Sequence, residues 1–94
     1  MSRRKKYDEK LVSIGEYLRK IRMSLGDSYK NRDDFIETTS KNLFNNEQWI
    51  SSRHLASIEL GHNMISLNLL IKLAYALEME PIDLFAKIIE IYKS

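Results

Sequence analysis

The sequence predicts an all-α domain of five helices, and three observations support this fold class. The 94-residue chain holds one proline and three glycines, so few residues interrupt a helix. Apolar residues recur with the 3.6-residue period of a helix along most of the chain, and no strand-like alternation or hairpin dipeptide stands out. The length and the hydrophobic fraction of 44% fit one small domain with one modest core. We expect residues 11–94 to form this domain and the basic residues 1–10 to form a flexible arm.

The first predicted helix covers residues 11–25, and Gly26 follows it as a terminator. Its apolar positions share one helical face; they are Ile14, Tyr17, Leu18, Ile21 and Leu25. Residues 27–31 form a turn. A second helix begins near Asn31, because acidic residues occupy its first turn, where the helix dipole favours negative charge; these are Asp33 and Asp34. One face of this helix carries Phe35, Thr39 and Leu43.

The third predicted helix, residues 51–60, is too short to be stable alone in water, because helix nucleation is costly. Ser51 is its expected N-cap, and Gly61 follows its end. With Leu55 and Ile58 turned to the core, the helical period points Arg53, Ser57 and Leu60 away from it. Ser52 and Ala56 lie at the flanks of this small, largely polar front, and His54 lies to one side of the core stripe. Such a helix fits the DNA major groove, about 12 Å wide, and an arginine near its start can donate two hydrogen bonds to guanine.

The last two predicted helices cover residues 67–77 and 82–92, and Pro81 opens the second of them, because proline suits a first helical turn. The expected core face of the former is Leu67, Leu70, Ile71, Ala74 and Leu77. The latter has two apolar stripes, one of Ile82, Phe85, Ala86 and Ile89 and the other of Leu84, Ile88 and Ile91. Either both stripes pack within a small globule or one of them forms a two-fold dimer. Trp49, before the third helix, is expected to bury its ring.

Two segments, IGEYLRKIRMSLG and ISSRHLASIELGHNMISLNLLIKLAYALEMEPIDLF, resemble the phage-repressor (Cro-like) helix-turn-helix family. The family pattern is a capping serine, a helix ending in Ile-Glu-x-Gly, a short loop, a helix rich in leucine and alanine, and a short terminal helix. The matching positions are Ser51, Ile58, Glu59, Gly61, Leu67, Leu70, Leu73, Ala74, Ala76, Leu77 and Leu84. This resemblance covers most of residues 14–85 and implies a compact, lambda-repressor-like DNA-binding domain.

The resemblance also implies residue roles on double-stranded DNA. Ser51 would cap the recognition helix and touch phosphate, whereas the positions that usually contact base edges are Ser52, Arg53 and Ser57. Arg32 stands where the family often has a glutamine near the DNA backbone. Apart from the resemblance, His62 and Asn63, just after the recognition helix, are suited to phosphate. The full set of expected DNA contacts is Arg32, Ser51, Ser52, Arg53, His54, Ser57, His62 and Asn63. Arg22 and Glu59 fall on positions that form an internal ion pair in the family; the alternative is a solvated Arg22.

Three features depart from the family pattern. The segment SKNLFNNEQW inserts about nine residues, around residues 41–49, where the family has a tight turn, so either the second helix is longer or the turn has become a loop. Leu60 replaces a residue that is commonly polar, and it would suit a thymine methyl group. Ile65 stands where proline is usual.

Charge and composition limit the classes of function. Residues 1–32 hold ten basic and four acidic residues, a net of +6, and residues 54–94 hold three and five, a net of −2. This asymmetry favours an anionic partner near the N-terminal half, although a basic tail and ordinary surface charge explain it as well. Without cysteine, and with His54 and His62 as the only histidines, a metal site lacks ligands. No nucleophile elbow, phosphate-binding loop or paired carboxylates indicate an enzyme. We expect no cofactor, and no small-molecule ligand is evident.

The sequence also favours a cytoplasmic location. No apolar run approaches the roughly 20 residues of a membrane span. The basic start MSRRKK is not followed by an apolar stretch, so it is not read as a signal peptide.

These observations predict a sequence-specific transcriptional regulator that is not an enzyme. It would be a repressor that binds a palindromic operator through the helix at residues 51–60. A homodimer through residues 82–92 would set two recognition helices about 34–36 Å apart, one DNA turn. The alternative is a protein-interaction module, such as the antitoxin of a toxin–antitoxin pair, with the apolar fifth helix and Leu60 as partner surface.

Overall fold

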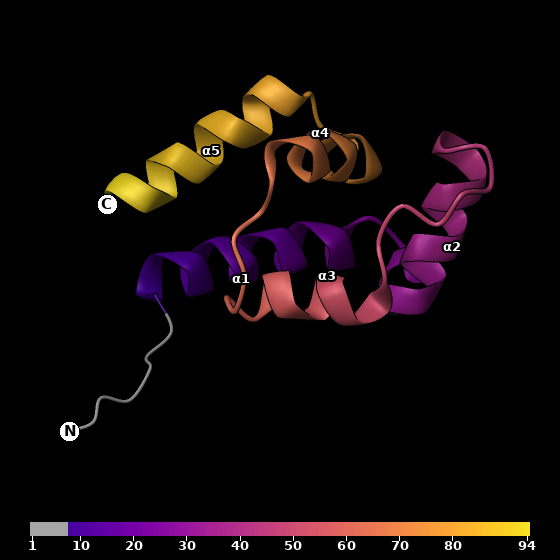
Figure 1. Ribbon diagram of the computed structural model, residues 1–94, viewed down its shortest axis with the longest axis horizontal. Helices are drawn as coiled ribbons and strands as arrows, with labels where there is room; N and C mark the ends of the chain where they lie inside the picture. Colours follow the sequence, from indigo (N-terminus) through magenta and orange to yellow (C-terminus); the bar gives the residue numbers. More distant parts are fainter. Residues whose placement is uncertain (1–7) are drawn as a thin grey trace.

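The computed structural model of the protein describes residues 8–94, which form five α-helices and one short 3-10 helix, with no strand among these residues (Figure 1). In chain order the elements are α1 (Glu9–Ser24), η1 (Asp27–Tyr29), α2 (Arg32–Leu43), α3 (Ser52–Glu59), α4 (Leu67–Ala76) and α5 (Pro81–Lys93). The predicted all-α architecture of five helices is confirmed. Of the arm predicted for residues 1–10, residues 1–7 lie outside the described residues, and the rest begin α1.

Side chains cap four of these helices at their N-termini. Oxygen atoms of the residues before α1, α2, α3 and α4 accept hydrogen bonds of 2.8–3.2 Å from backbone N–H groups in the first turn; the capping residues are Asp8, Asn31, Ser51 and Ser66. Asp8 moves the start of α1 two residues ahead of the predicted Leu11, because it satisfies a backbone donor there. Pro81 opens α5, as predicted.

The central element is α1, which packs against both α3 and α5. Figure 1 shows α1 between α3 on its lower side and α5 above, with α2 at the far end and α4 beside α5. Helices α2 and α4 close the core at that end, since α2 contacts α3 and α4. The most buried side chains of this core are Leu18, Phe35, Leu55, Leu73, Ala74, Ala76 and Leu84. The short α3 is therefore held by tertiary packing, which it needs because it is too short to be stable alone.

Helix α2 extends into residues 41–49 and the rest of this segment forms a loop, so both structures expected there occur. Helix α2 continues to Leu43, and residues 44–51 cross back to α3. The carbonyl of Ser40 accepts hydrogen bonds from the backbone N–H groups of Phe44 and Asn46, at 3.1 and 2.8 Å. The half-buried Trp49 anchors the loop: its ring meets Phe35 edge-on, and its Nε1 donates to Thr39 Oγ1 at 2.9 Å.

The predicted core face of α4 is wrong at two positions. Leu67 and Ile71 are exposed, at 69% and 40%, while Leu73 and Ala76 are buried in their place. Helix α4 is apolar on nearly every side, so its periodicity does not define one face. Its neighbours α2 and α5 decide which residues are covered.

Only one of the two apolar stripes of α5 packs within the chain. Leu84 is buried, and Ile88 and Ile91 pack against the core. The opposite stripe is exposed and consists of Ile82, Phe85, Ala86 and Ile89, with Tyr92 exposed as well. Only one stripe is thus used within the chain. On a third side of α5, a hydrogen bond to Glu90 and the negative charge of that residue raise the pKa of Lys87.

None of the helices in residues 8–94 combines the length and the apolar character that a membrane crossing requires.

Candidate nucleic-acid interface

The buried back of α3 is held against α1 at very short range. Leu55 and Ile58 are 1% and 2% exposed, as predicted. A Cβ atom on Gly15 of α1 would lie 2.6 Å from the carbonyl oxygen of Ile58, closer than side-chain carbon approaches such an atom. At the end of α3, Gly61 has a positive φ of 82°, and a Cβ there would meet the Val12 backbone at 2.7 Å. Two glycines therefore allow α1 to fix the position of α3.

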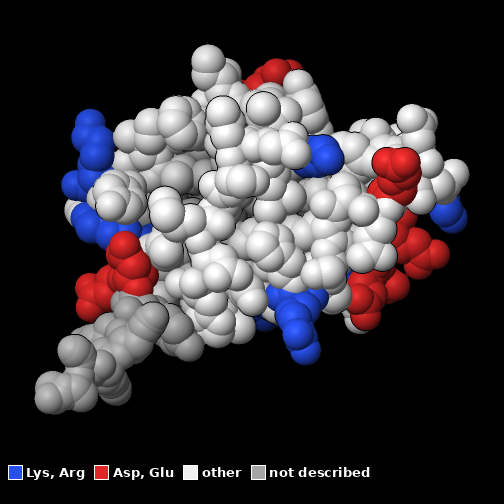
Figure 2. Space-filling model, viewed as in Figure 1, with Lys and Arg blue, Asp and Glu red and all other residues white. Residues whose placement is uncertain are grey.

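The front of α3 is open and carries the residues predicted to contact DNA. Arg53 and His54 are exposed, and so is Leu60, at 53%. The half-buried residues on this side are Ser52, Ala56 and Ser57. Figure 1 shows α3 at the lower edge of the molecule, and in Figure 2 a basic side chain projects from that edge. Of the three residues predicted to point away from the core, Arg53 and Leu60 are exposed and Ser57 is half-buried, whereas His54, predicted beside the core stripe, is exposed.

The N-terminus of α3 has one capped donor and the rest of its first turn available. Ser51 Oγ accepts a hydrogen bond of 3.0 Å from the His54 N–H, as its predicted capping role requires. Helix N-termini attract anions through free N–H groups and the helix dipole. After the helix, His62 and Asn63 are exposed in the connection to α4. The structure thus leaves the predicted phosphate contacts on both sides of α3 at the surface.

A buried carboxylate ties three segments together behind α3. Arg22 donates to both carboxylate oxygens of Glu59, from Nε at 2.7 Å and from Nη2 at 2.9 Å. The Arg22 Nη1 atom donates to the carbonyls of Tyr29 and Lys30, each at 2.8 Å. Both ionic side chains are almost fully buried, at 2% and 1% exposed. The predicted internal ion pair is confirmed, and the solvated alternative for Arg22 is excluded.

Arg32 is less free than its predicted place near the DNA backbone suggests. Its Nε donates to Glu59 Oε1 at 2.9 Å, so the carboxylate receives three N–H donors. The Arg32 side chain is still 30% exposed. It can therefore present its outer guanidinium edge to solvent while the pairing with Glu59 fixes its direction.

A polar cleft with four cationic residues lies where the N-termini of α2 and α3 meet. The cleft measures about 340 Å³ and is lined by Arg19, Arg22, Lys30, Asn31, Arg32, Asp33 and Ser52. Arg22 is committed to its buried partners, whereas Arg19 and Lys30 are exposed. The arrangement suits an anionic oxygen group such as a phosphate. The prediction missed Arg19 and Lys30 as members of a site, since sequence alone placed them only in the general basic excess of residues 1–32.

No group of three or more potential metal ligands is present in the portion of the chain from residue 8 onward. The histidines at positions 54 and 62 are both exposed and lie on either side of the end of α3. The groups that the surface offers are thus hydrogen-bond donors, small hydroxyls and positive charge.

Comparisons with protein-family models, with curated proteins and with solved structures found no match.

Proposed function

We propose that this protein is a sequence-specific DNA-binding regulator of transcription and that α3 is its recognition helix. The observation that carries this proposal is the pairing of a rigidly packed back with an open, arginine-bearing front on a helix of eight residues. A helix of this size enters the major groove, and small side chains at Ser52 and Ser57 permit close approach to base edges. Arg53, in the first turn, is suited to a bidentate contact with guanine.

The cleft at the start of α2 and α3 supplies the sequence-independent part of this binding. Arg19 and Lys30 are exposed and can meet phosphate oxygens, although Lys30 also pairs with the exposed Asp27 at 3.5 Å. Arg32 adds a directed positive edge. Phosphate contacts of this kind position a protein on DNA but carry no sequence information. Base selection then falls to α3. Repression by occupying an operator is the regulatory mode we favour.

The first experiment measures binding of the protein to the DNA upstream of its own gene, by fluorescence anisotropy over a series of salt concentrations. Arg53→Ala is expected to weaken binding to that DNA by about tenfold or more, while binding to unrelated DNA changes little. The reason is that a base contact contributes to sequence preference, whereas phosphate contacts support all DNA equally.

Two further variants distinguish phosphate contacts in the cleft from base contacts by α3. Lys30→Ala should weaken binding to every sequence and lower the slope of log affinity against log salt by about one. Lys93→Ala removes the same charge at the distant end of α5 and should change neither property. Equal effects of Arg53→Ala and Lys93→Ala on the upstream DNA would reject α3 as the reading element.

The exposed apolar stripe of α5 supports a second candidate, a protein-interaction module such as an antitoxin. In that case a partner protein would cover Ile82, Phe85 and Ile89, and DNA binding would be secondary. Co-purification of a protein encoded beside this gene, together with unchanged DNA binding by Arg53→Ala, would favour this candidate over the first.

A further inference from the structure

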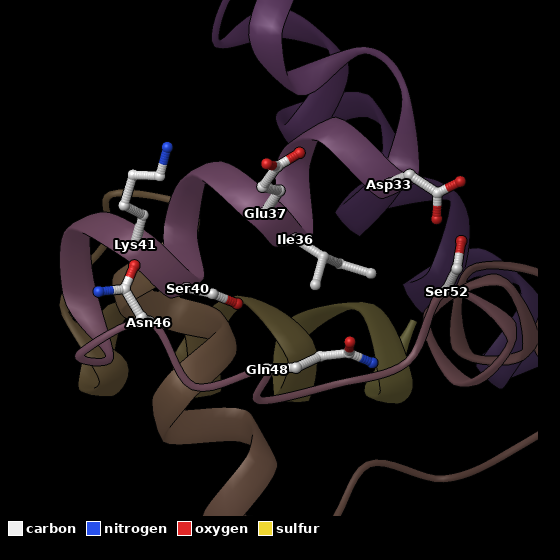
Figure 3. A pocket seen from close by; sticks show the side chains of 8 residues that line it. All are labelled: Asp33, Ile36, Glu37, Ser40, Lys41, Asn46, Gln48 and Ser52. Atoms are coloured by element: carbon white, nitrogen blue, oxygen red, sulfur yellow. The ribbon is translucent and has the colours of Figure 1, made fainter.

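A second cavity lies on the other side of the α3 start, between α2 and the loop of residues 44–51. It measures about 350 Å³, at the lower end of the range for small-molecule pockets. Helix α2 supplies one side and the segment leading into α3 supplies the other (Figure 3). The lining residues are Asp33, Ile36, Glu37, Ser40, Lys41, Asn46, Gln48 and Ser52. This groove is called the α2–loop groove below.

The α2–loop groove contains a buried hydroxyl without a hydrogen-bond partner. Ser40 is 7% exposed, and its Oγ is the one buried side-chain oxygen or nitrogen in residues 8–94 that lacks a partner. Figure 3 shows this hydroxyl directed into the space between Ile36 and Gln48. Burying a hydroxyl without a hydrogen bond costs free energy, so such a group bonds to a water molecule or to a bound polar molecule. The hydroxyl thus points to a ligand independently of the charged residues.

The charge of the groove decides what kind of ligand it suits. Asp33 and Glu37 are one helical turn apart on α2, and Lys41 is the only cation in the lining. Over residues 33–47 there are four acidic residues and one basic residue, a net of −3. Figure 2 shows acidic side chains gathered at the α2 end of the molecule. A phosphate or another anion is therefore disfavoured here, in contrast to the cleft beside Lys30.

The neutral groups favour a planar cation with several donors. Ser40 Oγ can accept one hydrogen bond, and the amide oxygens of Asn46 and Gln48 can accept others on the opposite side. A guanidinium group presents five N–H donors in one plane and pairs well with carboxylates. The largely buried Ile36 adds an apolar side chain to the lining, against which a short alkyl chain can pack.

We propose that the α2–loop groove binds a small organic cation, an alkylguanidinium, with Asp33 and Glu37 as charge partners and Ser40 Oγ as a buried acceptor. The groove shares Asp33 and Ser52 with the cleft beside Lys30, so the bound cation lies next to the first turn of α3. This proposal concerns binding alone and does not depend on the proposed DNA-binding function.

The test is an NMR titration of ¹⁵N-labelled full-length protein with butylguanidinium, beside butylurea as a neutral probe of the same shape. Butylguanidinium is expected to give saturable shifts of the Asn46 and Gln48 side-chain amides, and butylurea is expected to give none. Butylammonium, which has the charge without the planar donors, should bind more weakly than butylguanidinium.

Three variants assign the contacts. Glu37→Gln and Ser40→Ala should each weaken butylguanidinium binding by about fivefold, the loss expected for one ion pair or one hydrogen bond. Asp34→Asn removes an equal charge from α2 outside the groove and should change binding by less than about twofold. Ser40→Ala should also raise the melting temperature of the free protein, which shows that its weaker binding is not a folding defect.

Butylurea binding as well as butylguanidinium would overturn the proposal, and so would the absence of saturable shifts. An equal loss in Asp34→Asn and Glu37→Gln would also reject it, because the attraction would then be nonspecific.

Discussion

Glu59 is the residue on which the position of α3 most depends. It is the only buried carboxylate in residues 8–94, and two arginines from separate elements donate to it. The two guanidinium groups and one carboxylate leave a net positive charge, and the backbone carbonyls that accept from Arg22 offset part of it. Such a network contributes little more to folding stability than apolar side chains of the same volume would. Removing one partner is costly, however, because it leaves the other charged groups buried and unpaired.

Replacing this carboxylate is therefore expected to be costly. Glu59→Gln keeps the side-chain shape but removes the charge that Arg22 needs, so the free energy of unfolding should fall by about 3–5 kcal/mol in urea denaturation. Glu16→Gln, on the exposed side of α1, serves as the matched control and should change it by less than about 0.5 kcal/mol. A loss for Glu59→Gln no larger than that of the control would show that the buried pair is not important for stability.

At the scale of elements, the close approach of α1 and α3 rests on glycine rather than on large side chains. Gly15 lies in the interior of α1, where alanine would normally favour the helix by about 1 kcal/mol. Here, however, a Cβ would collide with the carbonyls of both Ile58 and Glu59. Because these atoms are backbone, the clash is relieved only by moving one helix.

Alanine is therefore expected to change the free energy of unfolding in opposite directions at two positions of α1. Gly15→Ala should lower the free energy of unfolding by about 1–3 kcal/mol, since overpacking outweighs the helix preference of alanine. Ser13→Ala, exposed on the same helix, should leave stability unchanged or raise it by about 0.5 kcal/mol. Thermal unfolding followed by circular dichroism measures both. Stabilisation by Gly15→Ala would mean that α1 and α3 are not in close contact.

Local signals account for what could be predicted about the elements. Some features depend only on residues near in sequence, so periodicity and capping rules predict them. Examples are the cap Ser51, the proline at the start of α5 and the regular apolar face of α1. Asp8 carries the same kind of local signal, a side-chain cap just before a helix, although the predicted helix began at Leu11. In α4, by contrast, Leu67 and Ile71 were misassigned because only the neighbouring helices decide which apolar residues they cover.

In the candidate site, too, features that depend on nearby residues were predictable, and contacts between distant residues were not. The front of α3 followed from the helical period, because exposure on a short helix with a clear apolar edge is a local property. The contact between Arg32 and Glu59 spans 27 residues, and no local pattern marks it. The unpartnered hydroxyl of Ser40 was equally hidden, since it depends on how the loop from Asn45 to Trp49 folds back over α2.

At the scale of the whole molecule, the exposed surfaces are separated by α1. The proposed DNA-contacting face belongs to α3, whereas the exposed apolar stripe belongs to α5, on the other side of α1 (Figure 1). An interface through α5 would therefore leave the front of α3 open. Two copies joined in this way would double the number of recognition helices on one DNA, which favours a palindromic site.

The α5 stripe should accordingly control assembly without controlling the fold. Phe85 is 48% exposed, so Phe85→Glu is expected to leave the circular dichroism spectrum unchanged, while the carboxylate it introduces opposes burial in an interface. Sedimentation equilibrium should show the dimer dissociation constant rising by about 100-fold.

Lys87→Gln lowers the net charge by the same unit on the same helix, outside the stripe, and should leave dimerisation unchanged. The affinity of Phe85→Glu for a single half-site should match that of wild type, because α3 is untouched. A wild-type protein that sediments as a monomer at every concentration would reject the α5 dimer while leaving the proposal for α3 intact.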